Sequence, residues 1–108
     1  MVIEDKPFQK RVVKPESAGF LLSEFKKLLV GTNGDKFTVP ALEASLDGFC
    51  EAQSIGMGDV IHALRVAVSG KAAGFGTIDT MAILGKDRCL NRLDLTLAQL
   101  EDYRNNAS

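Results

Sequence analysis

The stretch LRVAVSGKAAGFGTIDTMAILGKDRCLNRL, residues 64–93, reads as three helical pieces joined by two breaks, each marked by glycine. Within each piece the apolar residues recur at steps of three and four, which is the period of one face of an α-helix. Gly70 ends the first piece and Gly85 ends the second. The first break, residues 71–76, sets an aromatic ring between two glycines and close to a lysine, in what should be an exposed loop. We therefore expect any binding site to lie around this loop.

Outward from this stretch, the same periodicity predicts helices in the rest of the chain. A short helix is expected over 5–14, and a longer one over 16–30 with Ser17 as its N-cap. Another should run from a cap at Thr38, with a proline in its first turn, to Gly56. Strand-like alternation does not persist for more than a few residues. The predicted fold class is therefore all-α, a compact bundle of five or six helices.

The helix expected over 58–69 has one apolar side and one polar side. His62, Arg65 and Ser69 fall three or four positions apart, so they share the polar side. The apolar side should face the core. Gly48, in the preceding helix, should weaken that helix by about 1 kcal/mol relative to alanine. This glycine either permits close helix packing or has no packing role.

The last helix is expected over 86–103, with a core stripe of leucines. Arg88 and Arg92 are four positions apart and should share its outer face. The tail, residues 104–108, should be frayed because chain ends make few contacts. The sequence has 108 residues and contains no low-complexity linker, so the whole chain, 1–108, is expected to be a single helical domain.

Composition argues against several classes of protein. Cys50 and Cys89 lack paired metal-ligand spacing, so no metal site is expected and each cysteine should be a small buried hydrophobe. No run of eighteen apolar residues occurs, so no membrane span is expected. The N-terminus lacks the apolar core of a secretory signal, which makes a reducing cytoplasm the expected location.

Charge is distributed unevenly, although the chain carries a net charge of −1. Residues 65–92 hold five basic and two acidic side chains, and this excess of positive charge coincides with the opening stretch. Because salt confines electrostatic attraction to about 8–10 Å, a local basic patch can bind phosphate on a protein that is neutral overall. The alternative is that these side chains form an ordinary solvated helix face.

Two runs in the opening stretch carry a resemblance to a known family. They are Ala63-Leu64-Arg65-Val66-Ala67-Val68-Ser69-Gly70 and, further along, Leu84-Gly85-Lys86-Asp87-Arg88. In this order and spacing they resemble the C-terminal anticodon-binding domain of bacterial-type glutamyl-tRNA synthetases, which are class I aminoacyl-tRNA synthetases. The run FTVPALEASLDGF, residues 37–49, resembles the helix that precedes them in that family, so the resemblance covers nearly the whole chain. It implies a helical bundle of the class I anticodon-binding-domain type.

The resemblance implies a role for Arg65. In the family, the matching arginine and the loop after the next glycine meet the last base of the anticodon, and a guanidinium suits bidentate contact with a base or a phosphate. The alternative is a solvent-exposed arginine paired with Asp59 or Asp79. Family members often carry a proline in the loop, where this chain has Gly74-Phe75-Gly76-Thr77. A loop without proline is less preorganised, so ordering it around a base costs more entropy.

Phe75 would offset that cost by stacking on a base, which is worth about 1–3 kcal/mol. The alternative is that its ring folds back into the core. Lys71, Arg88 and Arg92 are weaker candidates for phosphate contacts, with an ordinary solvated charge as the alternative for each. The candidate RNA-binding residues are Arg65, Lys71, Gly74, Phe75, Gly76, Thr77, Arg88 and Arg92.

A catalytic site is not expected in this chain. His62 is its single histidine, which leaves no local partner for a histidine-based relay or metal cluster. The glycines do not form a phosphate loop, because Gly70 and Gly85 are each followed by lysine without the serine or threonine that such a loop needs. In the resembled family the synthetase chemistry belongs to a separate nucleotide-binding domain, whose motifs do not occur here. No cofactor is expected.

The expected partners are the anticodon stem-loop of tRNA-Glu and a catalytic synthetase domain, with no DNA and no membrane. In this hypothesis the chain recognises tRNA-Glu while another domain charges it, either within one synthetase or as a stand-alone relative. The alternative hypothesis is a stand-alone helical module, derived from that domain, that binds a protein partner or another RNA.

Overall fold

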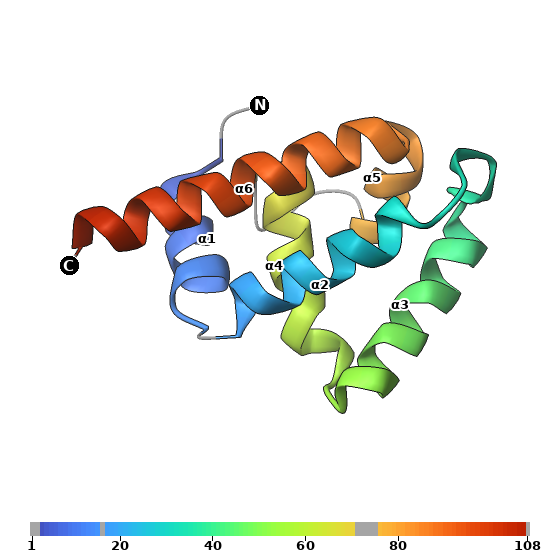
Figure 1. Ribbon diagram of the computed structural model, residues 1–108, viewed down its shortest axis with the longest axis horizontal. Coiled ribbons are helices and arrows are strands. Elements are labelled where there is room, and N and C mark those ends of the chain that lie inside the picture. Colours follow the sequence, from blue (N-terminus) through green and yellow to red (C-terminus); the bar gives the residue numbers. More distant parts are fainter. Residues whose placement is uncertain (1–2, 16, 71–75, 108) are drawn as a thin grey trace.

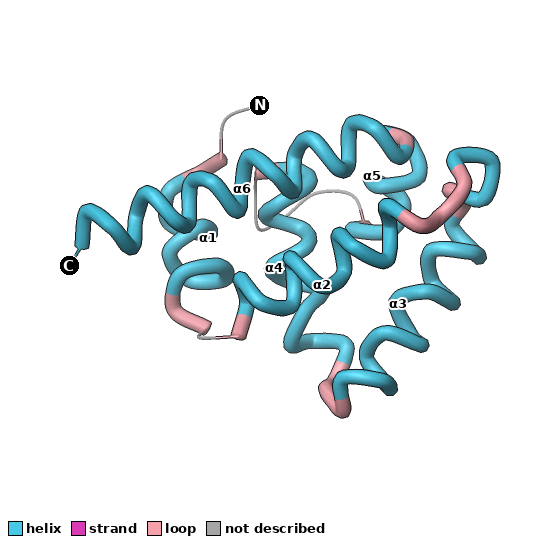
Figure 2. The backbone as a smooth tube through the Cα atoms, in the orientation of Figure 1, coloured by secondary structure: helices cyan, strands magenta, loops and turns pink. Residues whose placement is uncertain are grey.

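The computed structural model describes residues 3–15, 17–70 and 76–107 of the chain (Figure 1). Every regular element within these ranges is helical, which confirms the all-α class (Figure 2). The elements follow in the order α1 (Asp5–Phe8), η1 (Gln9–Val13), α2 (Ala18–Val30), η2 (Gly34–Lys36), α3 (Val39–Gln53), α4 (Met57–Ser69), α5 (Thr77–Leu84) and α6 (Lys86–Ala107). In this part of the chain, none of the helices is long and apolar enough to cross a lipid bilayer.

The helix α4 is the centre of the bundle. The elements α1, η1, α2, α3, α5 and α6 all pack against it, and Figure 1 shows it passing through the middle of the molecule. Burial on α4 differs from the expected face, because Ala63 and Val66 are buried whereas Met57 and Ile61 of the expected face are only half-buried. On the expected polar side, His62, Arg65 and Ser69 are all half-buried, and we call these three residues the polar strip of α4. The two-sided pattern is therefore confirmed, with a narrower polar side than expected.

The first residues of α2 and α3 differ from the expected caps. Ser17 occupies the N-cap position of α2, but its backbone is already helical and its side chain makes no capping hydrogen bond. Thr38 occupies the N-cap position of α3 with an extended backbone, again without a side-chain cap. The positions of both caps were predicted correctly and their hydrogen bonds were not. Pro40 lies in the first turn of α3, as expected, where its missing N–H has no helical partner.

The end of α3 comes before the expected stop at Gly56. Ser54 follows the last helical residue with a φ of 57°, the left-handed conformation that is uncommon for residues other than glycine. The amide of Ile55 donates to the carbonyl of Cys50 at 3.0 Å, which satisfies one of the carbonyls left open at the helix end. The glycine was the obvious terminator in the sequence, but the chain turns at a serine.

The short helix expected at the start of the chain is present, but it changes type after one turn. In η1 the amide of Lys14 donates to the carbonyl of Gln9 at 2.9 Å, which is the five-residue step of a π-helix. Phe8 and Val12 are buried, as expected. The ring of Phe8 also packs edge-on against Tyr103 of α6, with the ring centroids 6.3 Å apart. These contacts fix the first turns against the bundle.

The far end of α6 extends beyond the expected boundary. The helix is described to Ala107 and not only to Tyr103. Its leucine stripe packs as predicted, with Leu93 and Leu100 buried and Leu90 and Leu97 partly buried against the core. Fraying of the last turn stays a prediction.

Cys50 and Cys89 are both buried and neither forms a disulfide, which confirms their expected role as small buried residues. Burial raises the pKa of Cys89 to about 11, against an opposing effect of the nearby Arg92 charge. A thiol in this state stays protonated at neutral pH and is a poor nucleophile.

Gly48 and Gly85 make a matched pair for a test of backbone effects. A Cβ built at either position would have no neighbour within 4 Å, so Gly48 does not serve close packing. Gly48 lies inside α3, whereas Gly85 has a φ of +83° between α5 and α6. We expect Gly48→Ala to raise the free energy of unfolding by about 0.5–1 kcal/mol, because alanine loses less backbone entropy in a helix.

The control, Gly85→Ala, should lower the free energy of unfolding by about 1 kcal/mol or more, because a side chain is strained at that φ. Urea denaturation followed by circular dichroism measures both variants. A destabilised Gly48→Ala protein would show that α3 has a packing constraint at this position.

Candidate nucleic-acid interface

Arg65 links the polar strip of α4 to the first turn of α5. Its Nε donates to the Oγ1 of Thr77 at 3.2 Å, and Thr77 is buried with 3% of its surface exposed. The hydroxyl of Ser69 donates to the backbone carbonyl of Arg65 at 2.6 Å. Two carboxylates were considered as partners for Arg65. The side chain of Asp59 lies outside the described part of the structure, and the carboxylate of Asp79 lies beside Gly76. The bond to Thr77 directs the guanidinium toward the first turn of α5.

The loop between α4 and α5 is held at both ends by backbone bonds. At the first end, the amide of Gly70 donates to Val66 at 2.7 Å and its carbonyl accepts the amide of Glu4 at 2.8 Å. At the second end, the carbonyl of Gly76 accepts both the amide and the hydroxyl of Thr80, each at 2.9 Å. Lys71, Gly74 and Phe75 lie outside the described residues, so their proposed contacts stay predictions.

Gly76 is exposed beside this anchor, and a carboxylate lies close over it. A Cβ built at Gly76 would lie 2.9 Å from Oδ2 of Asp79. Any other residue at position 76 would therefore force the Asp79 side chain to move. The structure thus brings Arg65 to Thr77, which follows Gly76 at the start of α5. The contacts of these three residues with RNA stay predictions, and Thr77 is buried against Arg65 and not exposed to a ligand.

Arg92 does not share an outer face with Arg88, contrary to the expectation from their spacing. The Nη1 of Arg92 donates to the backbone carbonyl of Val68 at 2.5 Å, and its side chain is half-buried. Thr96, one turn later on α6, places its hydroxyl 3.4 Å from the carbonyl of Ala67. Carbonyls in the last turn of a helix have no partner within that helix. Arg92 is therefore turned inward, where it satisfies the end of α4.

Arg88 is exposed on α6, as expected for a phosphate-contacting or simply solvated cation. Lys86, two residues earlier, donates to the carbonyl of Val30 at 3.0 Å and so ties the start of α6 to the end of α2. Arg88 lies on α6, whereas Arg65 and Thr77 lie on α4 and α5.

His62 lies in an electropositive environment that the sequence did not reveal. Its pKa lies below the usual value of 6.5, because burial desolvates the ring and neighbouring cations disfavour its protonated form. In order of effect these cations are Arg11, Arg65 and Lys10. Two of them belong to η1, far from His62 in the sequence. The sequence shows that Lys10 and Arg11 are adjacent and lie between Phe8 and Val12, but it does not show that they lie near His62.

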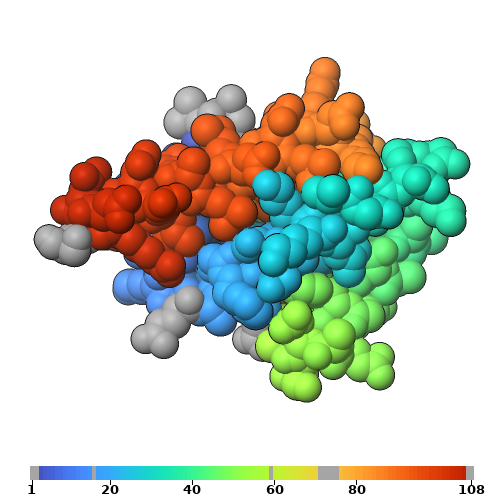
Figure 3. Space-filling model, in the orientation of Figure 1, coloured from blue at the N-terminus to red at the C-terminus, as the bar shows by residue number. Residues whose placement is uncertain are grey.

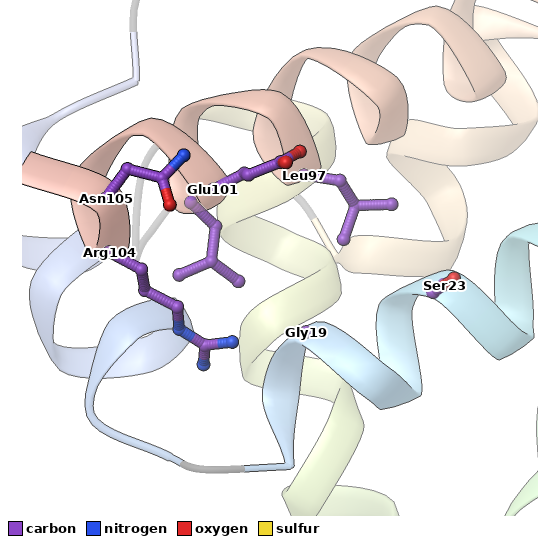
Figure 4. Close-up of a pocket in the computed structure, with 7 residues that line it drawn as sticks. Gly19, Ser23, Leu97, Glu101, Arg104 and Asn105 are labelled. Atoms are coloured by element: carbon purple, nitrogen blue, oxygen red, sulfur yellow. The ribbon is translucent and has the colours of Figure 1, made fainter.

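A groove of about 380 Å³ opens between α2 and α6, the two helices at the front of Figure 3. Figure 4 shows Arg104 reaching from α6 toward Gly19 on α2, with Leu97 between the helices. The remaining lining residues are Ser23, Leu100, Glu101 and Asn105. None of the candidate RNA-binding residues that the structure describes lines this groove, so the groove lies apart from the Arg65–Thr77 pair.

Comparison with known proteins places this geometry in a family. The family model described as "Anticodon binding domain" matches residues 1–97 of the chain. This chain belongs to the anticodon-binding domain family. The resemblance read from the two runs around the loop is thereby confirmed, and the match includes η1, the polar strip of α4 and the candidate loop.

Relatives of this anticodon-binding domain are glutamate–tRNA ligases. The protein from Desulforudis audaxviator is 33% identical over 105 residues, which cover 97% of this chain and 21% of that protein. A protein from Thermus thermophilus is 34% identical over 96 residues, which cover 88% of this chain and 20% of that protein. The chain therefore spans about a fifth of the length of the curated relatives it matches.

A solved structure supports the fold independently. The crystal structure of a glutamate–tRNA ligase from Elizabethkingia meningosepticum superposes with a TM-score of 0.79. The match covers 92% of this chain and 19% of that one, at 24% sequence identity. The helical bundle is therefore that of one portion of a much longer protein, which confirms the expected anticodon-binding-domain architecture.

Arg88 and Arg92, one turn apart on α6, provide a test of which cation supports the fold of the anticodon-binding domain. We expect Arg92→Ala to lower the free energy of unfolding by about 1–3 kcal/mol, because it removes a charged donor from the carbonyl of Val68. Arg88→Ala removes the same charge from an exposed position and should change stability by less than about 0.5 kcal/mol. Thermal and urea denaturation of both variants would measure the difference. Equal losses would mean that the bond to Val68 contributes nothing.

Proposed function

We propose that this domain recognises the anticodon stem-loop of tRNA-Glu and contributes tRNA selection to a glutamate–tRNA ligase. The names of the relatives support this proposal, since those that match nearly the whole chain are glutamate–tRNA ligases. The structural observation that carries it is the position of Arg65. Its guanidinium is half-buried, oriented by Thr77, and set beside a loop whose two ends are held by backbone bonds.

This arrangement suits the chemistry of reading an unpaired base. Proteins recognise single-stranded RNA by stacking on splayed bases and by hydrogen bonds to base edges. A guanidinium presents several N–H donors in a rigid planar fork, and the bond from Nε of Arg65 to Thr77 fixes the plane of that fork. Fixing the donor before RNA arrives reduces the entropy lost on binding. In this proposal Arg65 reads the last anticodon base.

The other candidate residues take supporting roles in the proposal. Phe75 stacks on a base, Gly74 and Gly76 shape the loop that receives it, and Lys71 contacts phosphate. Arg88 contacts phosphate as an exposed cation. Arg92 acts mainly through the end of α4, since its Nη1 is bonded to Val68.

We further propose that this chain acts as one non-catalytic unit, residues 1–108, without a cofactor of its own. Activation of glutamate and its transfer to tRNA would then be carried out by a separate catalytic domain. The setting of this work would be the cytoplasm, where translation takes place. The family assignment supports an RNA-binding role over the alternative of a module that binds a protein partner.

A titration of the domain with the anticodon stem-loop of tRNA-Glu tests the proposal. Binding should weaken with rising salt and should fall when the third anticodon base is changed. Arg65→Ala should weaken binding to the cognate stem-loop by about 1–3 kcal/mol, the value of a bidentate base contact. Fluorescence anisotropy with labelled stem-loops measures both quantities. Equal affinity of the unmodified domain for every stem-loop would refute base recognition.

Arg65→Lys and Thr77→Val separate charge from geometry in the same assay. Lysine keeps the positive charge and loses the planar fork, so overall affinity should be largely kept while discrimination at the third base falls. Thr77→Val removes the oxygen that orients the guanidinium and preserves the side-chain shape. It should reduce discrimination by less than Arg65→Ala does. Lys36→Ala, an exposed charge on η2, serves as the neutral control.

A further inference from the structure

The first turns of the chain present two cations on a fixed support. Phe8 and Val12 point into the core, so Lys10 and Arg11, which lie between them in the sequence, remain exposed and half-buried respectively. The elements α1 and η1 pack against α4, and the start of the chain is bonded to the end of α4. The positions of the two cations relative to the polar strip of α4 are therefore set by the core.

The packing of η1 against α4 brings these two cations to the same part of the molecule as His62. Their charges, and that of Arg65 one turn further along α4, all act on the imidazole. Two separate elements, η1 and α4, thus supply one cluster of four basic side chains: Lys10, Arg11, His62 and Arg65. We call this cluster the basic platform.

Nothing described in the structure neutralises the η1 half of the basic platform. The ion pairs in the described part of the chain join Lys26 to Asp94 and Lys27 to Glu24, and neither involves Lys10 or Arg11. Among the side chains that the structure describes, no carboxylate is one of the groups that shift His62. Cations held near one another repel, so an anion placed among them would be stabilised.

We propose that Lys10, Arg11 and His62 bind the phosphate backbone of an RNA strand whose base is engaged by Arg65. The inference rests on the proposed function, because it takes the ligand of Arg65 to be RNA. A phosphodiester backbone carries charges at regular intervals, and a base held by Arg65 brings its own backbone within reach of neighbouring side chains. Phosphate contacts fix the position of a nucleic acid and carry no base information. The basic platform therefore supplies affinity, and Arg65 supplies selectivity.

Protonation of His62 should be coupled to RNA binding. In the free protein, Arg11 and Lys10 from η1 and Arg65 from α4 favour the neutral imidazole, so the pKa of His62 is lowered. A bound phosphate would offset these charges and raise that pKa. The complex then takes up a proton, and affinity increases as the pH falls from neutral through the pKa of His62 in the complex.

The first test compares two double variants in the stem-loop titration. Lys10→Ala with Arg11→Ala removes the η1 half of the basic platform, and Lys27→Ala with Lys36→Ala removes the same charge from α2 and η2. The platform variant should bind about 5- to 30-fold more weakly, as expected for the loss of two ionic contacts. Its slope of log affinity against log salt should become shallower by about 1.4–1.8. The control should change neither quantity appreciably.

Base discrimination separates this inference from the proposed function. The platform variant should keep the affinity ratio between stem-loops that differ in the third base, whereas Arg65→Ala should lose it. Suppose that neither the unmodified domain nor any variant distinguishes the stem-loops, but the platform variant still binds more weakly and with a shallower salt slope. The phosphate-binding role of the basic platform would then be supported, and anticodon recognition would be refuted. If discrimination survives and the platform variant matches its control, the platform is wrong. A platform variant that loses discrimination selectively also overturns the assignment.

The second test uses His62 as a reporter, because it is the only histidine in the chain. A pH titration of its imidazole proton by NMR gives the pKa of this group directly. In the free protein, Lys10→Ala with Arg11→Ala should raise the pKa of His62, and the Lys27→Ala with Lys36→Ala control should leave it unchanged. Adding the cognate stem-loop to the unmodified protein should raise it as well. A pKa unmoved by both the platform variant and the RNA would overturn the proposal, even if a variant proved unstable in the binding assay.

Discussion

The burial of α4 on nearly every side is the constraint on which this domain depends. Helices from both ends of the sequence pack around it, so most of its apolar side chains are buried. Polar side chains on such a helix can occupy only the remaining strip. Arg65 lies in that strip and reaches Thr77, so the same packing that stabilises the core also places a guanidinium at the mouth of the loop. Stability and recognition thus share one helix.

Local features of the fold were predictable from the sequence. Apolar residues at three- and four-residue steps identified the long helices, because burying one face dominates helix stability in proteins. Gly70 and Gly85 were correct as breaks, since both adopt a positive φ that other residues avoid. The helix end at Ser54 was not predicted. A serine adopts the left-handed conformation because of the hydrogen bonds around it, and its residue type alone does not indicate that conformation. The π-helical turn of η1 was missed for a similar reason.

The candidate site was predictable only where its residues are close in the sequence. Arg65, Gly76 and Thr77 lie within one stretch of the sequence, and the structure places Arg65 against Thr77, next to Gly76. The prediction that Arg92 lies on the outer face of its helix was wrong. Helical spacing predicts which residues share a side of a helix, but it does not predict which backbone carbonyl a long side chain reaches. The environment of His62 was invisible, since its cations come from a segment about fifty residues earlier. Such charge clusters form only when the core brings distant elements together.

The anchors at Gly70 and Gly76 have a consequence for how the domain can change over evolutionary time. The bonds from Glu4 to Gly70 and from Thr80 to Gly76 join backbone atoms at the two edges of residues 71–75. The four residues that make those bonds lie outside that segment, so substitutions within it leave the bonding atoms in place. Substitutions that accumulate there should change ligand preference more than they change the stability of the fold. The segment is thus where a descendant of this domain could acquire a different nucleotide preference while inheriting an unchanged scaffold.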